Sequence, residues 1–410
     1  MTLETELLQM GRSARLAAAE LRSASAEQRS EGIRAMARAL WADRGGILAA
    51  NAEDMKAATV HHDRLRLDEE RLEAIAVALE QIAGLPDSVG VEMERWQRPN
   101  GLDIARVRTP IGVIGMIYES RPNVTADAAA ICLRSGNSVI LRSGSEALRS
   151  SLAIHGALER GLAEAGLPEA AVQIVRTPDR EAVGQLLRGL DGAIDLIIPR
   201  GGRALVERVQ QDARVPVLGH LEGVCHTYVH SAADPQMAAE IVRNAKLRRV
   251  SVCGSTETLL IDRDAAARLL PEIAAALDGC ELRGDELARS VVPMEPATEA
   301  DWHTEYLAPV LAVRTVDGVD EAVQHIATYG TGHTEAIITE DPAAAAHFLD
   351  QVDSAIVMWN ASTQFADGGE FGFGAEIGIA TGKLHARGPV GPEQLTTFKY
   401  VVRGEGQVRP

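Results

Sequence analysis

The sequence predicts an α/β protein of more than one domain, and three observations lead to this prediction. The chain has 410 residues, which is more than one hydrophobic core usually organises. Its first hundred residues place apolar side chains three and four positions apart, the spacing of helices. From Gly101 onward, short apolar stretches typical of strands alternate with helical stretches, and this alternation favours parallel sheets covered by helices.

The helical part is clearest over residues 31–58 and 67–85. Ser25 and Gln28 have the spacing of a capping box at the start of one of these helices. Two strands that pair with each other are expected at 102–108 and 110–119. The first architectural boundary is therefore expected near residue 101.

Two α/β series follow along the chain. In the first series, expected strands alternate with expected helices: strands at 138–142, 172–175, 195–199 and 215–218, helices at 146–165, 179–190 and 201–211. The second series has expected strands at 224–229, 257–262, 310–316 and 333–339, with helices that begin at Asp234-Pro235 and at residue 263. Ligands of such folds approach the carboxyl ends of the parallel strands, so a site is expected there. The glycine-rich region 368–391 is expected to be an ordered loop at a site or an interface.

Charge and composition exclude several classes of function. The formal net charge of −17 disfavours nucleic acid or an anionic membrane as a partner, because the field of the whole protein would repel both. The N-terminal stretch has no secretory pattern, and no apolar run reaches the ~18 residues of a membrane span. Only four cysteines occur, and they are widely spaced, which indicates a reducing cytoplasm.

Several well-known motifs are missing from the sequence. It contains no G-x-G-x-x-G, no Walker A loop, no H-E-x-x-H and no C-x-x-C pair. The adjacent His61 and His62 lie in a polar stretch and are expected to be solvated. The prediction is therefore that no metal is needed and that no standard Rossmann fingerprint is present.

The four cysteines differ in their surroundings. Cys132 and Cys225 lie in apolar segments, where an unpaired cysteine behaves as a small buried hydrophobe. Cys280 follows a turn and has no base nearby in the sequence. Cys253 lies between a helix and a strand among small residues, which leaves room for a ligand.

The helix before Cys253 ends in a basic run that contains Lys246, Arg248 and Arg249. Cations at this position complement the negative end of the helix dipole. The same helix end would raise the pKa of a neighbouring thiol, whereas nearby cations would lower it. On the residues alone, a nucleophile and a core thiol remain equally good interpretations of Cys253.

Several segments together carry a family resemblance: "YESRPNVTADAAAICLRSGNSVILRSGSEA", "PRGGRALVE", "NAKLRRVSVCGSTETLLID", "TEYLAPVLAV" and "GGEFGFGAEIGIATGKLHARGPVGPEQLTTFKY". With them, the chain resembles the gamma-glutamyl phosphate reductases, or glutamate-5-semialdehyde dehydrogenases, of the aldehyde dehydrogenase superfamily. The resemblance extends to about residue 402 and implies an α/β, aldehyde dehydrogenase-like fold with a Rossmann-like cofactor domain. The implied parts are an NADP-binding domain (1–98 and 113–224), a catalytic domain (225–380) and an oligomerisation segment (99–112 and 381–410).

The resemblance also implies a reaction: NADPH reduces L-glutamyl 5-phosphate to L-glutamate 5-semialdehyde and phosphate, in proline biosynthesis. Cys253 would exchange the acyl phosphate for a thioester, because hydride does not readily add to a carboxylate. Asn123 matches the asparagine that stabilises the oxyanion, with the backbone N–H of Cys253 as the second donor. The alternative for Asn123 is a turn residue after Arg121-Pro122.

Cofactor residues also follow from the resemblance. Glu305 matches the glutamate that holds the nicotinamide ribose hydroxyls. Arg142, Ser143 and Ser145 match the adenosine-ribose segment, where they could receive the 2′-phosphate of NADP. For Arg142, the alternative is an ordinary charge at the end of a strand. The remaining candidates precede an expected helix, whose first N–H groups could bind phosphate: Arg200, Gly201 and Gly202.

The substrate carries its own carboxylate and therefore needs a basic contact. The sequence does not rank the candidates, which are Arg121, Lys246, Lys383, His385 and Arg387. His220 stands where hydrolytic aldehyde dehydrogenases have the glutamate that activates water, although Glu222 is two residues away. The loss of that glutamate would protect the thioester from hydrolysis. Contact with phosphate and capping of a strand are both open interpretations of His220.

A departure from the family pattern, an alternative function and two expectations about assembly complete the prediction. Many family members have proline before the cysteine region and asparagine after the cysteine, where this chain has "RRVSVCGS" with Gly254, which leaves substrate affinity and the shape of the pocket open. The alternative function is an NAD(P)-dependent aldehyde oxidiser or an acyl-CoA reductase of the same superfamily. A homo-oligomer is expected, with dimer and tetramer both open, and association with glutamate 5-kinase is a further expectation.

Overall fold

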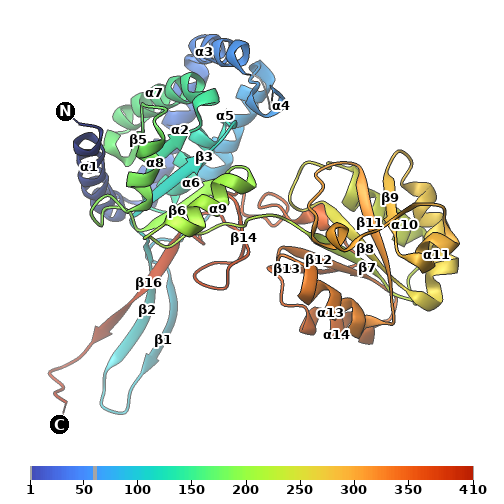
Figure 1. Cartoon of the computed structure of the whole chain (residues 1–410). Helices are drawn as coiled ribbons and strands as arrows, with labels where there is room; N and C mark the ends of the chain where they lie inside the picture. The colour runs from blue at the N-terminus through green and yellow to red at the C-terminus, as the bar shows by residue number, and fades with distance from the viewer. Residues whose placement is uncertain (1, 59–61, 410) are drawn as a thin grey trace. The chain divides into compact units, whose positions relative to one another are not determined.

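The structure is a computed structural model that describes residues 2–58 and 62–409. The chain forms two compact units (Figure 1). Unit 1 comprises Met1–Gly219, Gly372–Gly378 and Val390–Pro410, and unit 2 comprises His220–Phe371 and Ile379–Pro389. Each unit contains a parallel sheet with helices, so the predicted α/β class is confirmed. The roles predicted for the domains stay predictions.

Unit 1 begins with helices, as the apolar spacing predicts. The helices of this unit are α1 (Leu3–Ser23), α2 (Ala26–Ala42), α3 (Arg44–Ala57), α4 (His62–Leu65), α5 (Glu69–Gly84), α6 (Val124–Arg134), α7 (Leu148–Glu164), α8 (Arg180–Leu187) and α9 (Arg203–Asp212). The predicted capping box is confirmed at α2, where Ser25 and Gln28 each accept a hydrogen bond from the other's backbone N–H. Of the two adjacent histidines, His62 is exposed and His61 lies outside the described residues.

The sheet of unit 1 has parallel strands in the order β5-β4-β3-β6. Their bounds are β3 (Val113–Tyr118), β4 (Ser138–Ser143), β5 (Val172–Ile174) and β6 (Leu196–Arg200). Every residue of β3 and β4 is buried. The strand expected at 215–218 is wrong: only Val217 forms an isolated bridge, to Ile197, and Pro216 has no N–H to donate.

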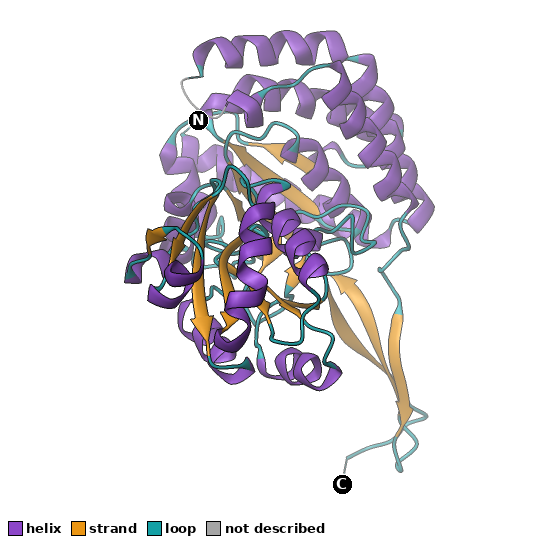
Figure 2. Cartoon of the chain, turned by 90° about the vertical axis from the view of Figure 1, so that its right-hand side faces the viewer, coloured by secondary structure: helices purple, strands orange, loops and turns teal. Residues whose placement is uncertain are grey.

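A second sheet of unit 1 is antiparallel and has the order β1-β2-β16. Its strands are β1 (Glu92–Gln97), β2 (Asp103–Pro110) and β16 (Thr396–Arg403). They form a ribbon that projects from the rest of this unit (Figure 2). The expected pairing of 102–108 with 110–119 is therefore wrong, because β2 pairs with β1 and β16 while β3 joins the parallel sheet. Alternation indicated both strands, but it carries no information about their partners.

Unit 2 contains a parallel sheet whose described strands have the order β10-β9-β11-β8-β7-β12-β13. The strands are β7 (Cys225–Val229), β8 (Thr256–Asp262), β9 (Glu281–Gly284), β10 (Glu295–Pro296), β11 (Val310–Val316), β12 (Thr334–Ile338) and β13 (Ile356–Trp359). The helices are α10 (Pro235–Leu247), α11 (Arg263–Ala276), α12 (Glu286–Val291), α13 (Val319–Tyr329) and α14 (Pro342–Gln351). Leu259 and Ile261 of β8 join the core beneath α10 and α11, whereas Leu260 joins a second core with residues of α13 and α14. Helices therefore cover both faces of this sheet.

The glycine-rich region is ordered, as expected, and contributes to both units. Gly372–Gly378 belongs to unit 1 and Ile379–Pro389 to unit 2, where the two-residue strands β14 (Ile379–Ala380) and β15 (Gly388–Pro389) pair. Within the described ranges, no helix combines the length and the apolar character that a membrane crossing requires.

Candidate active site

Cys253 lies in the turn between α10 and β8, as the sequence predicts. The preceding helix begins as predicted. The Asp234 side chain accepts a hydrogen bond from the backbone N–H of Met237, and Pro235 occupies the first turn. Gln364 holds the end of this helix in place, because its side-chain amide donates hydrogen bonds to the carbonyls of Ala245 (3.0 Å) and Arg249 (3.2 Å). The turn that carries the thiol is thus held by buried hydrogen bonds.

Two glycines allow the close packing of this turn. A Cβ atom at Gly223 would lie 2.1 Å from the carbonyl oxygen of Cys253, so this position requires glycine. A Cβ atom at Gly254 would lie 3.0 Å from the carbonyl oxygen of Thr363 and 3.4 Å from the Cβ of Ala366. Gly254 therefore packs closely against the segment around Thr363.

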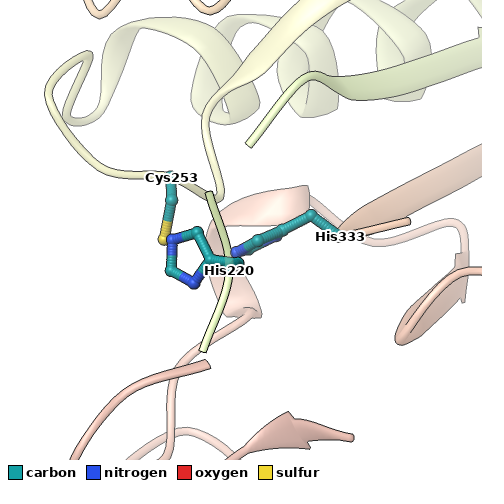
Figure 3. A group of neighbouring side chains, drawn as sticks. All are labelled: His220, Cys253 and His333. Atoms are coloured by element: carbon teal, nitrogen blue, oxygen red, sulfur yellow. The ribbon is translucent and has the colours of Figure 1, made fainter. Parts of the chain in front are cut away.

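Two histidines lie beside the thiol. One donor atom from each of His220, Cys253 and His333 lies within 4.8 Å of the others. Figure 3 shows the sulfur next to a ring nitrogen of His220, with His333 on the other side of that ring. The two imidazoles make an edge-to-face contact with 4.8 Å between ring centroids. The three side chains form one cluster, which we call the thiol cluster.

The thiol cluster lies at the amino ends of three neighbouring strands. His220 comes before β7, Cys253 before β8 and His333 directly before β12, and these strands are adjacent in the order β8-β7-β12. The expectation that the site lies at carboxyl ends of strands is therefore wrong for unit 2. Strand alternation predicts a parallel sheet, but the polarity of the site depends on which connecting segments carry reactive groups.

Hydrogen bonds orient both imidazoles. The Nδ1 of His220 donates to the carbonyl oxygen of Ile379 at 2.7 Å, which leaves Nε2 for the thiol side. The Nδ1 of His333 lies 2.9 Å from the hydroxyl of Thr334. His333 is fully buried, and its Nε2 has no hydrogen-bond partner among the described residues. Each ring therefore has one nitrogen held in place by the protein.

The thiols of the four cysteines differ sharply in pKa. Burial alone would raise the pKa of the Cys253 thiol, but the charge of His333 and hydrogen bonding to His220 hold it well below its usual range. Burial raises the pKa of Cys132 and of Cys225, and it raises the pKa of Cys280 to about 11. Cys132 and Cys225 are fully buried, as predicted. Only Cys253 therefore combines partial exposure with an environment that favours the thiolate.

The basic run before Cys253 contains both exposed and buried residues. Arg248 and Arg249 are exposed, but Lys246 is fully buried and forms an ion pair with the equally buried Glu257. Lys246 nevertheless lies in the last turn of α10, where a cation complements the helix dipole, as predicted. As a substrate contact it is not carried further, because its ammonium already pairs with a carboxylate inside the protein.

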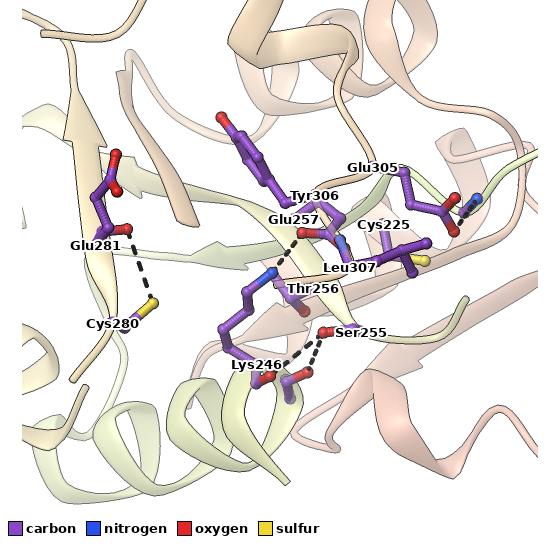
Figure 4. Close-up of polar contacts among 12 residues, drawn as sticks. Cys225, Lys246, Ser255, Thr256, Glu257, Cys280, Glu281, Glu305, Tyr306 and Leu307 are labelled. Atoms are coloured by element: carbon purple, nitrogen blue, oxygen red, sulfur yellow. Dashed lines mark hydrogen bonds and ion pairs between the residues drawn. The ribbon is translucent and has the colours of Figure 1, made fainter. Parts of the chain in front are cut away.

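The buried pair supports the loop that carries Glu305 (Figure 4). Glu257 accepts a hydrogen bond from the backbone N–H of Leu307 at 3.3 Å, and Leu307 has a φ of 51°, in the left-handed region. Glu305 accepts from the backbone N–H of Gly223 at 2.9 Å. Burial raises the pKa of Glu257 to about 7 and also raises that of Glu305. This loop is thus joined both to Lys246 and to the glycine that packs against Cys253.

The candidate residues of unit 1 follow its parallel strands. Asn123 comes after β3 at the start of α6, is half-buried, and donates its side-chain amide to Asp127 at 2.9 Å. Arg142 is the penultimate residue of β4 and has a buried guanidinium that donates to the carbonyls of Ser143 and Pro178. Ser143 is buried and Ser145 is exposed. Of the β4 candidates, only Ser145 therefore offers an exposed hydroxyl.

The other unit 1 candidates lie at the start of α9 and after β3. Arg200 ends β6 and is half-buried, while Gly201 and Gly202 are exposed. The backbone N–H of Gly202 donates to Glu119 at 3.0 Å, so a carboxylate already uses this donor. Arg121 is half-buried in the segment between β3 and α6.

The basic residues of the glycine-rich region belong to unit 2. Lys383 and Arg387 both pair with Asp353, and the Arg387 guanidinium also donates to the Asp353 carbonyl at 2.7 Å. His385 is exposed and has a φ of 70°. Their predicted contacts with substrate stay predictions.

His333 is the functional residue that the sequence reasoning missed. It occupies the first position of the expected strand 333–339, where it was treated as part of a strand. A usable signal was present, because His220 and Cys253 also come just before expected strands of the same series. A search of the segments before strands would have grouped the three.

Comparison with known proteins agrees with this architecture. The model of the aldehyde dehydrogenase family matches residues 4–301 and 290–377. The chain belongs to the aldehyde dehydrogenase family. Members of this family are oxidoreductases with a nicotinamide cofactor, and the fold class predicted from the sequence is that of the family.

Relatives place the chain more narrowly within the aldehyde dehydrogenase family. The chain is similar to a gamma-glutamyl phosphate reductase of Caulobacter vibrioides, with 67% identity over 98% of this chain and 99% of the relative. One from Caulobacter sp. strain K31 is 65% identical over the whole of both chains. A crystal structure of gamma-glutamyl phosphate reductase from Thermotoga maritima has a TM-score of 0.96 and 45% identity, and it covers 99% of this chain and 100% of its own.

Proposed function

We propose that the chain reduces L-glutamyl 5-phosphate to L-glutamate 5-semialdehyde with release of phosphate, as a step of proline biosynthesis. One observation carries the proposal: Cys253 is the one described thiol with a lowered pKa, and it forms a cluster with His220 and His333. The relatives named above support the choice of substrate. An acyl phosphate suits a thiolate nucleophile, because it already carries a good leaving group.

The first step forms a thioester on Cys253. The thiolate attacks the acyl carbonyl, a carbon–sulfur bond forms, and the bond from carbon to the phosphate oxygen breaks with its electron pair leaving on phosphate. The two imidazoles lower the energy of the thiolate before the attack. We retain Asn123 and the backbone N–H of Cys253 as oxyanion donors on the family resemblance.

The second step returns the thiolate. A nicotinamide cofactor supplies hydride to the thioester carbon. The resulting thiohemiacetal anion on Cys253 collapses to the aldehyde, and the sulfur leaves as thiolate. The cycle begins and ends with the thiolate and needs no obligatory proton transfer. A thiolate that persists through the cycle therefore suits it.

Glu305 is the proposed ligand for the nicotinamide ribose. Its Oε1 is fixed by Gly223, and the half-buried side chain keeps a second carboxylate oxygen that could accept a ribose hydroxyl. For NADP, we propose that the exposed hydroxyl of Ser145 contacts the 2′-phosphate. The positive charge of Arg142 would attract the same phosphate. Arg200, Gly201 and Gly202 remain candidates for the other phosphates.

The residue that replaces the water-activating glutamate is consistent with a thioester that must not be hydrolysed. His220 stands where hydrolytic relatives are expected to have a glutamate, and its Nδ1 is committed to Ile379. For the substrate α-carboxylate, we propose Arg121, His385 and Arg387, with Lys383 as an alternative to Arg387 at the shared Asp353.

The test is phosphate dependence in the reverse direction. With glutamate 5-semialdehyde as substrate, NADP reduction should require phosphate or arsenate, because only these anions can release the acyl group from Cys253. Equal rates without them would point to a hydrolytic aldehyde oxidiser, and a requirement for coenzyme A would point to an acyl-CoA reductase. NAD should be compared with NADP in the same assay.

We propose a cytoplasmic homo-oligomer that assembles through the antiparallel sheet of unit 1. Large apolar side chains on this sheet are 38–57% exposed: Met93, Phe398, Tyr400 and Val402. Light scattering of the full chain should give a mass above that of one chain, and charged replacements at Phe398 and Tyr400 should reduce it. The association with glutamate 5-kinase stays a prediction that no particular surface supports.

A further inference from the structure

We propose that His220, Cys253 and His333 form a site for a single Zn²⁺ ion, and that zinc binding reversibly blocks the thiol. The three side chains supply two imidazole nitrogens and one sulfur, from segments far apart in the sequence. Thiolate and imidazole are the ligands that Zn²⁺ prefers, whereas Mg²⁺ and Ca²⁺ prefer oxygen.

The spacing of the donor atoms suits one ion. They lie within 4.8 Å of one another. Ligands on a shared tetrahedral zinc lie about 3.3–3.6 Å apart, given Zn–S near ~2.3 Å and Zn–N near ~2.0 Å. Side-chain rotations that bring each donor inward by about 1 Å or less close that difference. A fourth position remains for water.

The surroundings of the two imidazoles are those of metal ligands. Such a histidine usually engages its other ring nitrogen with an oxygen of the protein, which fixes the ring. His220 does so through Ile379 (2.7 Å) and His333 through Thr334 (2.9 Å). The Nε2 of the fully buried His333 has no hydrogen-bond partner among the described residues, and a metal ion would supply one.

Zinc at this position would inhibit any reaction that uses the thiolate. The sulfur electron pair that attacks a carbonyl would instead bind the ion, so the nucleophile is withdrawn without covalent damage. Chelation of the ion restores it. The inference depends on the geometry of the thiol cluster and not on the identity of the substrate. It can therefore fail while the proposed function stands, and the reverse also holds.

Direct binding is measured with Co²⁺ as the probe, on full-chain protein freed of metal with EDTA and then dialysed. We expect saturation at one Co²⁺ per chain, with the charge-transfer absorption of a cobalt–thiolate bond. Added Zn²⁺ should displace the Co²⁺ and abolish this absorption. In parallel, one equivalent of Zn²⁺ should slow alkylation of Cys253 by iodoacetamide at least about tenfold, and EDTA should reverse the effect.

Variants identify the ligands. Cys253→Ser should lose the charge-transfer band, and His333→Gln should weaken Co²⁺ binding at least about tenfold. The matched controls are Cys280→Ser, a partly exposed thiol, and His347→Gln, an exposed histidine paired with Asp320, and both should bind as the parent does. Circular dichroism of each variant establishes that it is folded. If a variant is unfolded, the protection of Cys253 in the parent chain decides the question.

Three results would overturn the proposal. They are the absence of saturable Co²⁺ binding, a charge-transfer band that persists in folded Cys253→Ser, and alkylation of Cys253 in the parent chain that Zn²⁺ does not slow.

Discussion

The candidate residues of the two units lie at opposite ends of their parallel strands. In unit 1, Asn123 and Ser145 follow β3 and β4 and come just before helices α6 and α7. In unit 2, Cys253 and His333 come just before β8 and β12, in segments that follow the ends of helices α10 and α13. One edge is therefore lined by helix beginnings and the other by helix ends.

This difference has an electrostatic consequence. The first turn of a helix carries partial positive charge and favours anions, so the edge of unit 1 suits the phosphates of the proposed cofactor. The last turn carries partial negative charge, which favours imidazolium but opposes a thiolate. The thiolate of Cys253 therefore needs His220 and His333, whose proximity holds its pKa low. In unit 2, the histidines thus stabilise a thiolate at a helix end that would by itself disfavour it.

The largest expected effect comes from removing the nucleophile of unit 2. Cys253→Ser should lower kcat by at least about 10³-fold, because a serine hydroxyl stays protonated beside the same imidazoles. Binding of NADPH, measured by fluorescence titration, should be unchanged. Cys280→Ser is the matched control and should keep full activity. Turnover near that of the parent in Cys253→Ser would refute a covalent mechanism.

The next effect concerns the buried ion pair behind the site. Lys246→Met leaves the charge of Glu257 buried and unpaired, so the free energy of unfolding should fall by about 3–5 kcal/mol. The double variant Lys246→Met with Glu257→Leu should lose much less, because no isolated charge remains. Urea denaturation of the three proteins measures both values. A double variant as unstable as Lys246→Met would mean that packing, rather than the isolated charge, dominates.

Gly223→Ala tests how closely the turn of Cys253 must be packed. The added methyl would overlap the Cys253 carbonyl oxygen at 2.1 Å, so the turn must shift. A displacement of the nucleophile near 1 Å should lower kcat about 10²-fold. Gly46→Ala is the control, since a Cβ there meets nothing within 4 Å in helix α3. Unchanged kinetics in Gly223→Ala would contradict the packing derived for this turn.

A smaller effect is expected at the edge of unit 1. Ser145→Glu places a carboxylate in the short 3-10 helix (Ser145–Ala147) that precedes α7, where it would repel a 2′-phosphate. We expect KM for NADPH to rise about tenfold, with KM for NADH nearly unchanged. The alkylation rate of Cys253 should not change, because the thiol cluster belongs to unit 2. Equal rises for both cofactors would indicate a general disturbance rather than discrimination at the phosphate.

The sequence predicted the fold where local signals were strong. The capping box at Ser25 and the start of α10 at Asp234-Pro235 were both read correctly, because caps are local hydrogen bonds between near neighbours. The partner of β2 was not predicted, because the paired residues 103–110 and 396–403 lie far apart in the sequence. Alternation identifies a strand without identifying its neighbour.

The site was predicted only in part for a similar reason. Cys253 was singled out by its small neighbours and by family resemblance, and His220 by its place in that resemblance. His333 occupies the start of an apolar strand, and nothing in the sequence indicates that Lys246 is buried. Neither could be predicted, because the burial and pairing of a polar residue depend on contacts distant in sequence, such as that between Lys246 and Glu257.

The central claim is that the two histidines keep Cys253 as a thiolate, and the pH dependence of its alkylation tests this most directly. Iodoacetamide modification of all four cysteines is followed by mass spectrometry at pH 6 and pH 9, with EDTA present. Because the pKa of Cys253 is held well below its usual range, its rate at pH 6 should stay within about tenfold of that at pH 9. His333→Gln should lower the pH 6 rate at least about tenfold. A fall of about 200-fold in the parent, as for a thiol with a pKa near ~8.5, would contradict the account.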